Sequence, residues 1–149
     1  MREMLVSGEM SMPLLEVEDL KVSFRVPGHP EPLRAVDGVT FSIREGESVG
    51  LVGESGCGKT TIGNAITGLV AVTEGRILFK GAQTIGLKRR SLRMFRRSVQ
   101  MVFQDPFGSL NPRISVGSAI REVLKVHGLA ADRQDCELKI AGLLKAVGL

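Results

Sequence analysis

Eight residues at positions 53–60, GESGCGKT, carry the residue types needed to hold a row of phosphates. They match the pattern G-x-x-x-x-G-K-[ST], in which glycines let the backbone curl so that successive N–H groups face an anion. A following helix adds partial positive charge at its N-terminus. Lys59 would reach the β- and γ-phosphates, and the Thr60 hydroxyl is the expected Mg²⁺ ligand. The spacing therefore predicts a nucleoside triphosphate site; the simpler alternative is a glycine-rich turn beside a surface lysine.

The elements on either side must position this loop. Residues 48–53 form a short apolar run, typical of a strand buried on both faces of a sheet. After the loop, apolar residues follow helical spacing and predict a helix that ends near Gly68, with one face formed by Ile62, Ala65, Ile66 and Leu69. Strand, loop and helix in this order are what the motif requires.

The rest of the chain predicts alternating strands and helices. Strands are expected at 14–24, with a kink at Asp19 and Leu20, at 35–43, at 75–81 and, as a second buried strand, at 98–104. Val39, Phe41 and Ile43 should share one face. A helix is expected at 87–97 with Leu92 and Phe95 facing inward, followed by a proline-rich loop at 105–113.

Two amphipathic helices should follow that loop. One spans 116–127 behind the N-cap Ser115, and the other spans 132–147 behind the N-cap Asp132 and before Gly148. Their expected inward faces are Val116, Ala119, Ile120, Val123 and Leu124 in the first, and Cys136, Ile140, Leu143, Leu144 and Val147 in the second.

The amino-acid composition narrows the class of protein to which the chain can belong. The 149 residues are 43% hydrophobic and 24% charged, which excludes a disordered tail, a collagen-like fibre and a coiled coil. Two cysteines exclude a disulfide framework, and no apolar run is long enough to span a membrane. The net charge is +4, but eight Lys or Arg and no acid lie between Arg76 and Gln104. This basic stretch would suit nucleic acid or anionic lipid; the alternative is a solvated helix face.

A second candidate site residue, Gln104, ends the strand expected at 98–104 and precedes the loop DPFGSLNPR. A glutamine at the carboxyl end of a strand beside a phosphate loop is placed to ligate Mg²⁺ or to hold water near the γ-phosphate. Most glutamines are surface groups, so this interpretation depends on the strand before it and the loop after it.

GESGCGKTT and MVFQDPFGSLNPR resemble the ATP-binding subunits of ABC transporters, above all the branch serving dipeptide, oligopeptide and nickel importers. LKVSFRV and AVDGVTFSIREGESVGLVGESG also fit that branch, so the resemblance runs from about Leu14 to Leu149. It implies an α/β fold of the P-loop NTPase type, with an N-terminal antiparallel β subdomain and the start of a helical subdomain.

The resemblance also implies site residues. Those expected to bind the nucleotide are Phe24, Gly53, Glu54, Ser55, Gly56, Cys57, Gly58, Lys59, Thr60 and Thr61. Phe24 would stack on the adenine, although it could instead be a core residue of the first sheet. Lys59 and Gln104 would act in catalysis, and Thr60 and Gln104 would hold Mg²⁺.

The implied function is that of an energy-coupling subunit that binds ATP and Mg²⁺ and powers import of peptides or nickel, which the sequence does not distinguish. Expected partners are transmembrane permease subunits, a second ATPase subunit and, indirectly, an extracytoplasmic solute-binding protein, with no nucleic acid. Such a subunit would lie peripherally on the cytoplasmic face of the cell membrane.

The sequence lacks the family's signature motif, the Walker B strand with its catalytic Glu, the D-loop and the switch histidine; His29 and His127 match no switch position. The chain is therefore expected to be roughly the N-terminal half of a nucleotide-binding domain, with negligible ATP hydrolysis and marginal stability by itself. Its expected parts are an extension (1–13), a β subdomain with the P-loop core (14–104), a Q-loop (104–113) and the start of a helical subdomain (114–149). Met12 is a second candidate initiator.

Two other functions remain open. One is a P-loop ATPase that acts on nucleic acid through the basic residues 76–97, and the other is a non-catalytic fragment with a binding role. A further hypothesis concerns Cys57, which lies next to a helix N-terminus that favours thiolate. Its oxidation would block nucleotide binding; the alternative is a small residue tolerated in the loop.

Overall fold

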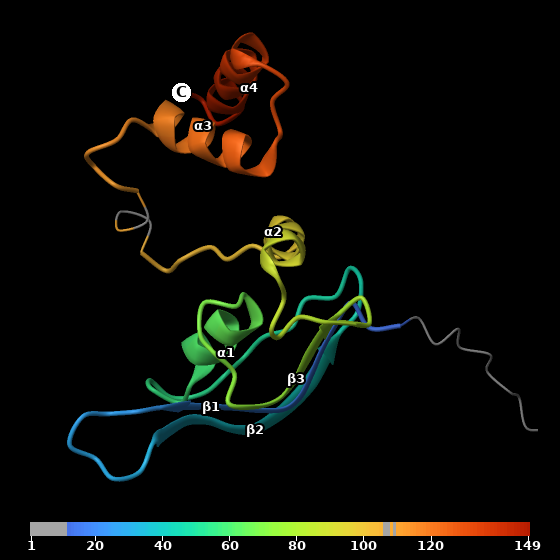
Figure 1. Ribbon diagram of the computed structural model, residues 1–149, viewed down its shortest axis with the longest axis vertical. Coiled ribbons are helices and arrows are strands. Elements are labelled where there is room, and N and C mark those ends of the chain that lie inside the picture. The colour runs from blue at the N-terminus through green and yellow to red at the C-terminus, as the bar shows by residue number, and fades with distance from the viewer. Residues whose placement is uncertain (1–11, 106–107, 109) are drawn as a thin grey trace, which may run out of the picture. The chain divides into compact units, whose positions relative to one another are not determined.

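A computed structural model describes residues 12–105, 108 and 110–149, which form two compact units, one ending at Val99 and the other beginning at Gln100 (Figure 1). The extension before Met12, with its alternative start, and three positions of the 105–113 loop lie outside the described residues. Among the described residues, no helix combines the length and the apolar character needed to cross a membrane.

The first unit is built on an antiparallel sheet. Its strands are β1 (Leu15–Phe24), β2 (Leu33–Ile43), β3 (Glu74–Phe79) and β4 (Ala82–Gln83), in the spatial order β2-β1-β3-β4. The strands expected at 14–24, 35–43 and 75–81 are confirmed. Val39, Phe41 and Ile43 pack together against the core, as their alternation predicted.

A β-bulge interrupts β1 where the sequence predicted a kink. The register with β2 shifts between Val17 and Leu20, and Asp19 has a left-handed φ of 44°. The bulge moves the buried phase by one residue, so Leu15 and Val17 face the core before it and Leu20 and Val22 after it. On the neighbouring strand, Gly75 leaves room for the bulge, because a Cβ there would lie 2.3 Å from the Asp19 carbonyl oxygen.

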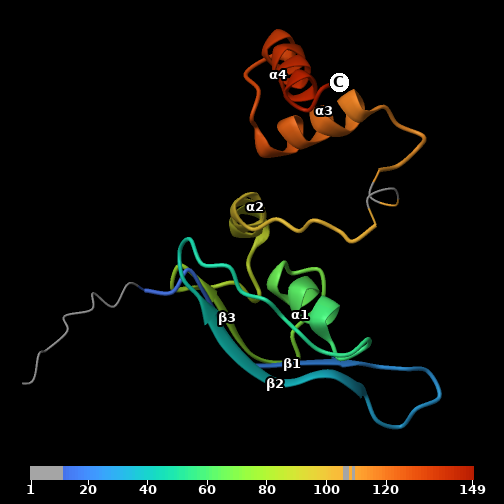
Figure 2. The same ribbon diagram turned by 180° about the vertical axis from the view of Figure 1, so that it is seen from behind.

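Helix α1 (Lys59–Ile66) covers one face of this sheet, as both views show (Figure 2). Ile62 and Ala65 join a buried cluster with β1, β2 and β3, and Ile66 packs against it, as predicted. Leu69 does not: the helix ends at Ile66, so Leu69 follows the turn and its side chain is exposed. The face was therefore predicted correctly but one turn too long.

Helix α2 (Arg89–Ser98) has the inward residues that were expected. Phe95 is only 8% exposed and Leu92 is half-buried. The Phe95 ring meets Phe79 of β3 edge to face, with ring centroids 5.7 Å apart. Two anchors thus orient a helix whose other residues are mostly charged.

The second unit pairs α3 (Val116–His127) with α4 (Arg133–Ala146). The predicted caps are confirmed, since Ser118 N–H donates to Ser115 Oγ at 3.2 Å and Asp135 N–H donates to Asp132 Oδ1 at 2.8 Å. Leu124, Cys136 and Ile140 form a small core, with Ile120 and Leu144 against it. The predicted faces were too wide, because two helices cover only a narrow stripe of each other; the residues left exposed are Val116, Val123, Leu143 and Val147.

Two predicted strands do not form. Residues 48–53 and 99–103 take no strand conformation, and both segments expose apolar side chains. Val52 is 98% exposed and Val102 is 97% exposed. A strand needs neighbours that accept and donate its backbone hydrogen bonds, and none of the four described strands pairs with either segment. The apolar pattern was correct, but the surfaces that would bury it are not among the described residues.

Acid should weaken the second unit through Asp135. Its carboxylate accepts hydrogen bonds from Lys139 Nζ and Ala131 N–H at 2.7 and 2.8 Å, and these lower the pKa of Asp135 below its ordinary value of 3.8. A lowered pKa gives stability that is complete above pH 3.8 and is lost as the pH falls through the folded-state pKa. Urea unfolding followed by circular dichroism should show this loss in the wild type and a smaller one in Asp135→Asn. Glu45→Gln is the matched control, and equal pH profiles for all three proteins would contradict the prediction.

Candidate phosphate-binding site

The loop at 53–58 leads directly into α1. Within it, Cys57 N–H donates to the Glu54 carbonyl oxygen at 3.3 Å and closes a tight turn. Gly56 and Gly58 have φ angles of 83° and 93°, a left-handed conformation that residues with a Cβ adopt at a cost. These two glycines therefore give the chain the curvature that the motif predicted.

In the first turn of α1, backbone hydrogen-bond donors have no acceptor among the described residues. Its first intrahelical bond runs from Ile62 N–H to the Gly58 carbonyl oxygen at 2.9 Å, so the N–H groups of Lys59, Thr60 and Thr61 precede it. The N-cap is Gly58, which has no side chain to accept from them, and the first turn holds no acidic residue. Helix dipole and free donors together favour an anion at this end of α1.

Lys59 folds back over the loop. Its Nζ donates to the carbonyl oxygens of Gly53 and Glu54 at 2.7 and 2.6 Å, and lies 3.4 Å from Cys57 Sγ. The ammonium is thus held above the loop by backbone oxygens and has no carboxylate partner among the described residues. Its charge is left to act on an incoming anion.

The shape of the loop fits a phosphate chain. A Cβ on Gly53 would lie 2.5 Å from Cys57 Sγ and 4.0 Å from Lys59 Nζ, so any side chain there would fill the cradle. A Cβ on Gly56 would meet nothing within 4 Å, which leaves that side open to solvent. Thr60, in the first turn, is exposed and places a hydroxyl beside the cradle. Donors, cation and space together suit a nucleotide's phosphates with their Mg²⁺.

Strand β2 supports the loop from below, and the sequence carried no signal for this. A Cβ on Gly58 would lie 2.4 Å from the Ala35 carbonyl oxygen and 3.4 Å from Val36 Cγ2. The backbone of the phosphate loop therefore rests directly on β2, where only glycine fits. The motif identified Gly58 as a turn residue but could not show which strand it touches.

Phe24 lies at the end of β1 near this contact. Val22 pairs with Val36, and Phe24 pairs with Leu33, so Phe24 is within a few residues of the strand segment on which Gly58 rests. Phe24 also continues the buried phase of Leu20 and Val22, on the face that α1 covers. It is 39% exposed, because it lies beyond that cover. Its ring is thus accessible, unlike those of a core phenylalanine.

Gln104 belongs to the second unit, whereas the phosphate loop belongs to the first. The meeting of Gln104 with Thr60 at one Mg²⁺ ion therefore stays a prediction. Gln104 itself is exposed and follows the exposed residues Val102 and Phe103. The structure therefore brings together Lys59, Thr60 and the loop glycines, with Phe24 nearby.

Comparison with protein families gives a match over residues 36–149 to the family described as ABC transporter. The oligopeptide transport ATP-binding protein OppF of Escherichia coli is 43% identical over 143 residues, which are 91% of this chain and 43% of that protein. OppF of Bacillus subtilis is 45% identical, covering 94% of this chain and 46% of its own. The chain spans less than half the length of these relatives.

Solved structures have the same fold. The dimeric ATP-binding cassette MJ0796, bound to ADP and Pi, superposes with a TM-score of 0.73 at 25% identity, covering 88% of this chain and 56% of its own. CbiO1 from Clostridium perfringens, part of the transporter complex cbiONQ, superposes with a TM-score of 0.65 at 26% identity, covering 92% of this chain and 51% of its own. Two independent cassettes thus share the arrangement of sheet, loop and helices.

Proposed function

We propose that this chain, which belongs to the ABC transporter family, binds MgATP as the N-terminal part of an importer's energy-coupling subunit. The observation that supports this most directly is the position of Lys59. Its ammonium is held over a curled glycine loop by two carbonyl oxygens, next to the uncapped first turn of α1. Cation, backbone donors and helix dipole converge where a triphosphate would lie.

Each site residue then has a role in the proposal. Lys59 binds the β- and γ-phosphates, Thr60 holds Mg²⁺ through its hydroxyl, and Phe24 stacks on the adenine. Gln104 completes the Mg²⁺ shell or positions the attacking water. The metal, when bound, neutralises charge on the phosphates, and this chain's residues orient it. Hydrolysis belongs to the longer protein, because this sequence has no Walker B acid and no signature motif.

The proposed partners follow from the relatives. OppF proteins are named for oligopeptide transport, and a further relative is named as the glutathione import ATP-binding protein GsiA. We propose a peptide as the solute, permease subunits and a second ATPase subunit as partners, and the cytoplasmic face of the membrane as the location. A role on nucleic acid receives no support from these relatives.

Nucleotide titration tests the function. We expect MgATP to bind at least about tenfold more tightly than AMP, because AMP lacks the two phosphates that Lys59 reaches and a charge-assisted hydrogen bond contributes about 1.5–3 kcal/mol. Isothermal titration calorimetry on the 149-residue chain measures both affinities. Equal affinities for ATP and AMP, or none for either, would refute the proposal.

Cys57 offers a second readout. Its thiol is exposed and lies 3.4 Å from Lys59 Nζ, inside the cradle. Bound phosphates would cover it, so saturating MgATP should slow its alkylation by iodoacetamide several-fold, as followed by peptide mass spectrometry. Cys136, buried between α3 and α4, is the internal reference because its rate should not respond to the nucleotide. Alkylation of Cys57 at the same rate with and without MgATP would count against both phosphate binding and the redox hypothesis.

A further inference from the structure

Helix α2 carries an unusual charge for so short an element. Its ten residues include Arg89, Arg90, Arg93, Arg96 and Arg97, preceded by Lys88, and all six side chains are exposed. No acidic residue occurs between Arg76 and Gln104 in the sequence. Arg89, Arg90, Arg93 and Arg97 make no ion pair with any described residue. The helix therefore keeps most of its positive charge facing solvent.

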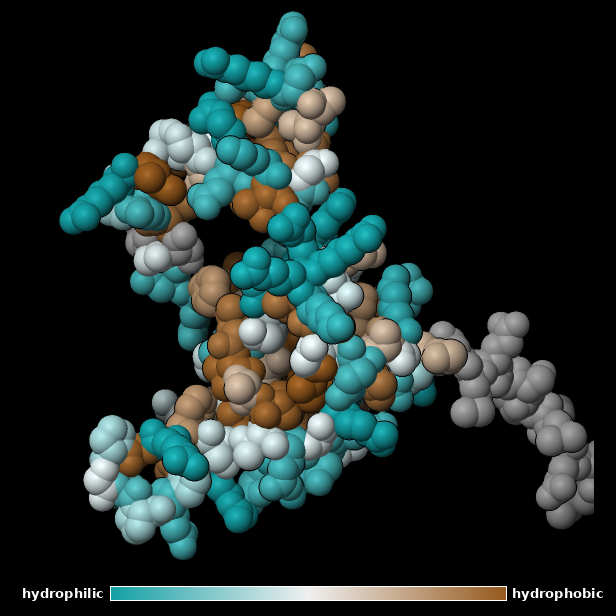
Figure 3. All heavy atoms as spheres, viewed as in Figure 1, coloured by the Kyte–Doolittle hydropathy of each residue, from teal (hydrophilic) through white to brown (hydrophobic). Residues whose placement is uncertain are grey.

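The charges form a stripe. Arg89, Arg93 and Arg97 recur at four-residue spacing and so lie one above another on the helix, with Arg90 and Arg96 on either side. Phe95 and Leu92 point the opposite way, into the first unit. Figure 3 shows hydrophilic side chains gathered over α2 and hydrophobic surface next to them. We refer to these five arginines with Lys88 as the α2 stripe.

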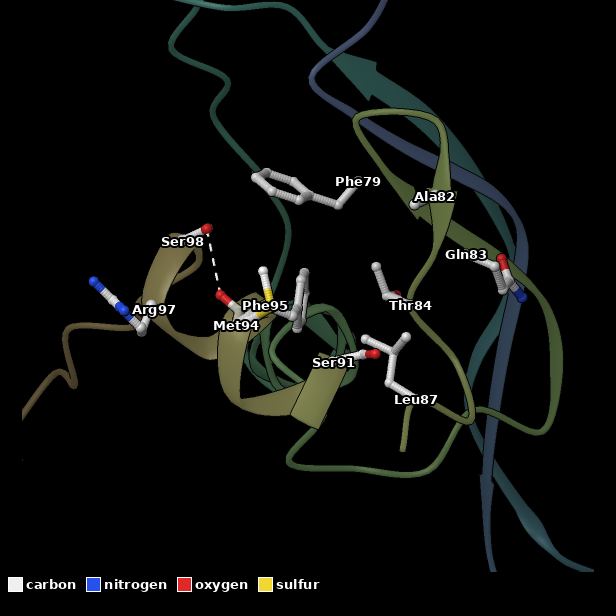
Figure 4. Close-up of a pocket in the computed structure, with 10 residues that line it drawn as sticks. All are labelled: Phe79, Ala82, Gln83, Thr84, Leu87, Ser91, Met94, Phe95, Arg97 and Ser98. Carbon is white, nitrogen blue, oxygen red and sulfur yellow. Dashed lines mark hydrogen bonds between the residues drawn. The ribbon is translucent and has the colours of Figure 1, made fainter. Parts of the chain in front are cut away.

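An apolar border runs along one side of the α2 stripe. Met94 lies about one helical turn from both Arg90 and Arg97, and its side chain is 64% exposed. It lines an open cavity of about 580 Å³ between α2 and the β3–β4 hairpin, with Phe79 and Leu87 among its walls. Arg97 also lines this cavity, and in Figure 4 its guanidinium group points away from Phe79, whereas Met94 and Phe95 turn toward Phe79. Cationic and apolar groups are thus adjacent on one surface.

We propose that α2 contacts a bilayer surface containing anionic lipid, with the α2 stripe against the headgroups and Met94 inserted at its border. A basic helix with an apolar edge binds such a surface by combining charge attraction with shallow burial of apolar side chains. The residues of this contact lie outside the phosphate loop, and the contact does not depend on nucleotide binding.

Two observations favour lipid over nucleic acid as the partner. Surfaces that bind single-stranded nucleic acid combine basic groups with accessible aromatic rings for stacking. On α2 the one aromatic ring, Phe95, is buried and already packed edge to face against Phe79. The exposed apolar group is Met94, a flexible side chain suited to the acyl boundary rather than to base stacking.

Vesicle sedimentation of the full 149-residue chain tests this proposal. The probes are vesicles of phosphatidylcholine alone and of phosphatidylcholine with phosphatidylserine, at low and high salt. We expect binding to the mixed vesicles that high salt weakens, and little binding to phosphatidylcholine. The triple variant Arg89→Glu, Arg90→Glu and Arg93→Glu should bind at least about 100-fold more weakly, since each basic residue near an anionic surface contributes about fivefold in affinity.

The variants are chosen so that α2 survives. The three glutamates fall in the N-terminal half of the helix, where carboxylates interact favourably with the helix dipole, and circular dichroism checks the fold. A matched control variant makes the same charge change at exposed sites elsewhere, through Arg25→Glu, Arg113→Glu and Arg133→Glu. This control should retain most of its binding to the mixed vesicles. Met94→Gln, which keeps helix propensity, should bind severalfold more weakly at unchanged charge.

Three other outcomes would overturn the proposal. Equal binding to both vesicle types would show that exposed apolar segments, not the α2 stripe, drive association. Equal losses of vesicle binding in the two triple variants would show that the net charge of the chain, and not the position of the α2 stripe, drives binding. The partner would be nucleic acid if the chain bound a labelled DNA or RNA duplex in a salt-sensitive way but did not bind anionic vesicles. In that case the α2 triple variant should lose the binding to the duplex. Full MgATP affinity in the α2 triple variant would show that loss of lipid binding is not loss of the nucleotide site.

Discussion

Lys59→Ala is expected to weaken MgATP binding by on the order of 100-fold. The ammonium is held over the loop by the Gly53 and Glu54 carbonyl oxygens and has no carboxylate partner among the described residues, so its charge is available to the β- and γ-phosphates. Hydrogen bonds to charged groups contribute about 1.5–3 kcal/mol each, and two bonds at the lower end of this range account for the expected loss. Isothermal titration calorimetry measures it.

A matched variant separates the site from general charge. Lys80→Ala removes another lysine of the first unit, one that lies over the Phe79 ring rather than over the loop, and should leave the affinity for MgATP unchanged. AMP provides a second check, because Lys59→Ala should reduce the preference for ATP over AMP. Wild-type affinity for MgATP in Lys59→Ala would show that the loop at 53–58 is an ordinary glycine-rich turn.

Gly58→Ala is expected to remove nucleotide binding and to destabilise the first unit together. The residue has a φ of 93°, and a Cβ would lie 2.4 Å from the Ala35 carbonyl oxygen of β2. A left-handed conformation costs a non-glycine residue about 1–2 kcal/mol, and overpacking adds about 1–3 kcal/mol. The expected loss in the free energy of unfolding is therefore about 2–5 kcal/mol, measured by urea denaturation.

Gly46→Ala is the control that separates the effect of backbone strain from the effect of the close contact between residue 58 and β2. Gly46 has a similar φ of 76°, but a Cβ there would meet nothing within 4 Å. It should lose only about 1–2 kcal/mol and should keep its affinity for MgATP. Equal losses in the two variants would mean that β2 does not hold the phosphate loop.

The elements predicted best are those whose determinants are local. The curled loop could be predicted because glycines at positions such as Gly56 and Gly58 adopt a left-handed backbone at little cost, and Lys59 and Thr60 follow at fixed spacing. Ser115 and Asp132 were identified as caps because a side-chain oxygen three residues before a free N–H satisfies it wherever the helix lies. The kink in β1 was visible in the break of its alternation.

Predictions that needed a partner surface were less successful. Val52 and Val102 lie in apolar runs that resemble buried strands, yet both are almost fully exposed. Leu69, Val123 and Leu143 have the right helical spacing but lie beyond the reach of the neighbouring elements. An apolar pattern shows which side chains would gain from burial, and a second surface must be present before that gain is realised.

The sequence alone was enough to locate the phosphate loop and Lys59, because local backbone sterics and the spacing of residues along the chain determine both. The contact of Gly58 with Ala35, the accessible ring of Phe24 and the apolar border of the α2 stripe came only from the folded chain. These features join residues that are distant in sequence, and the free energy that aligns them comes from burying β1, β2, β3 and α1 against one another.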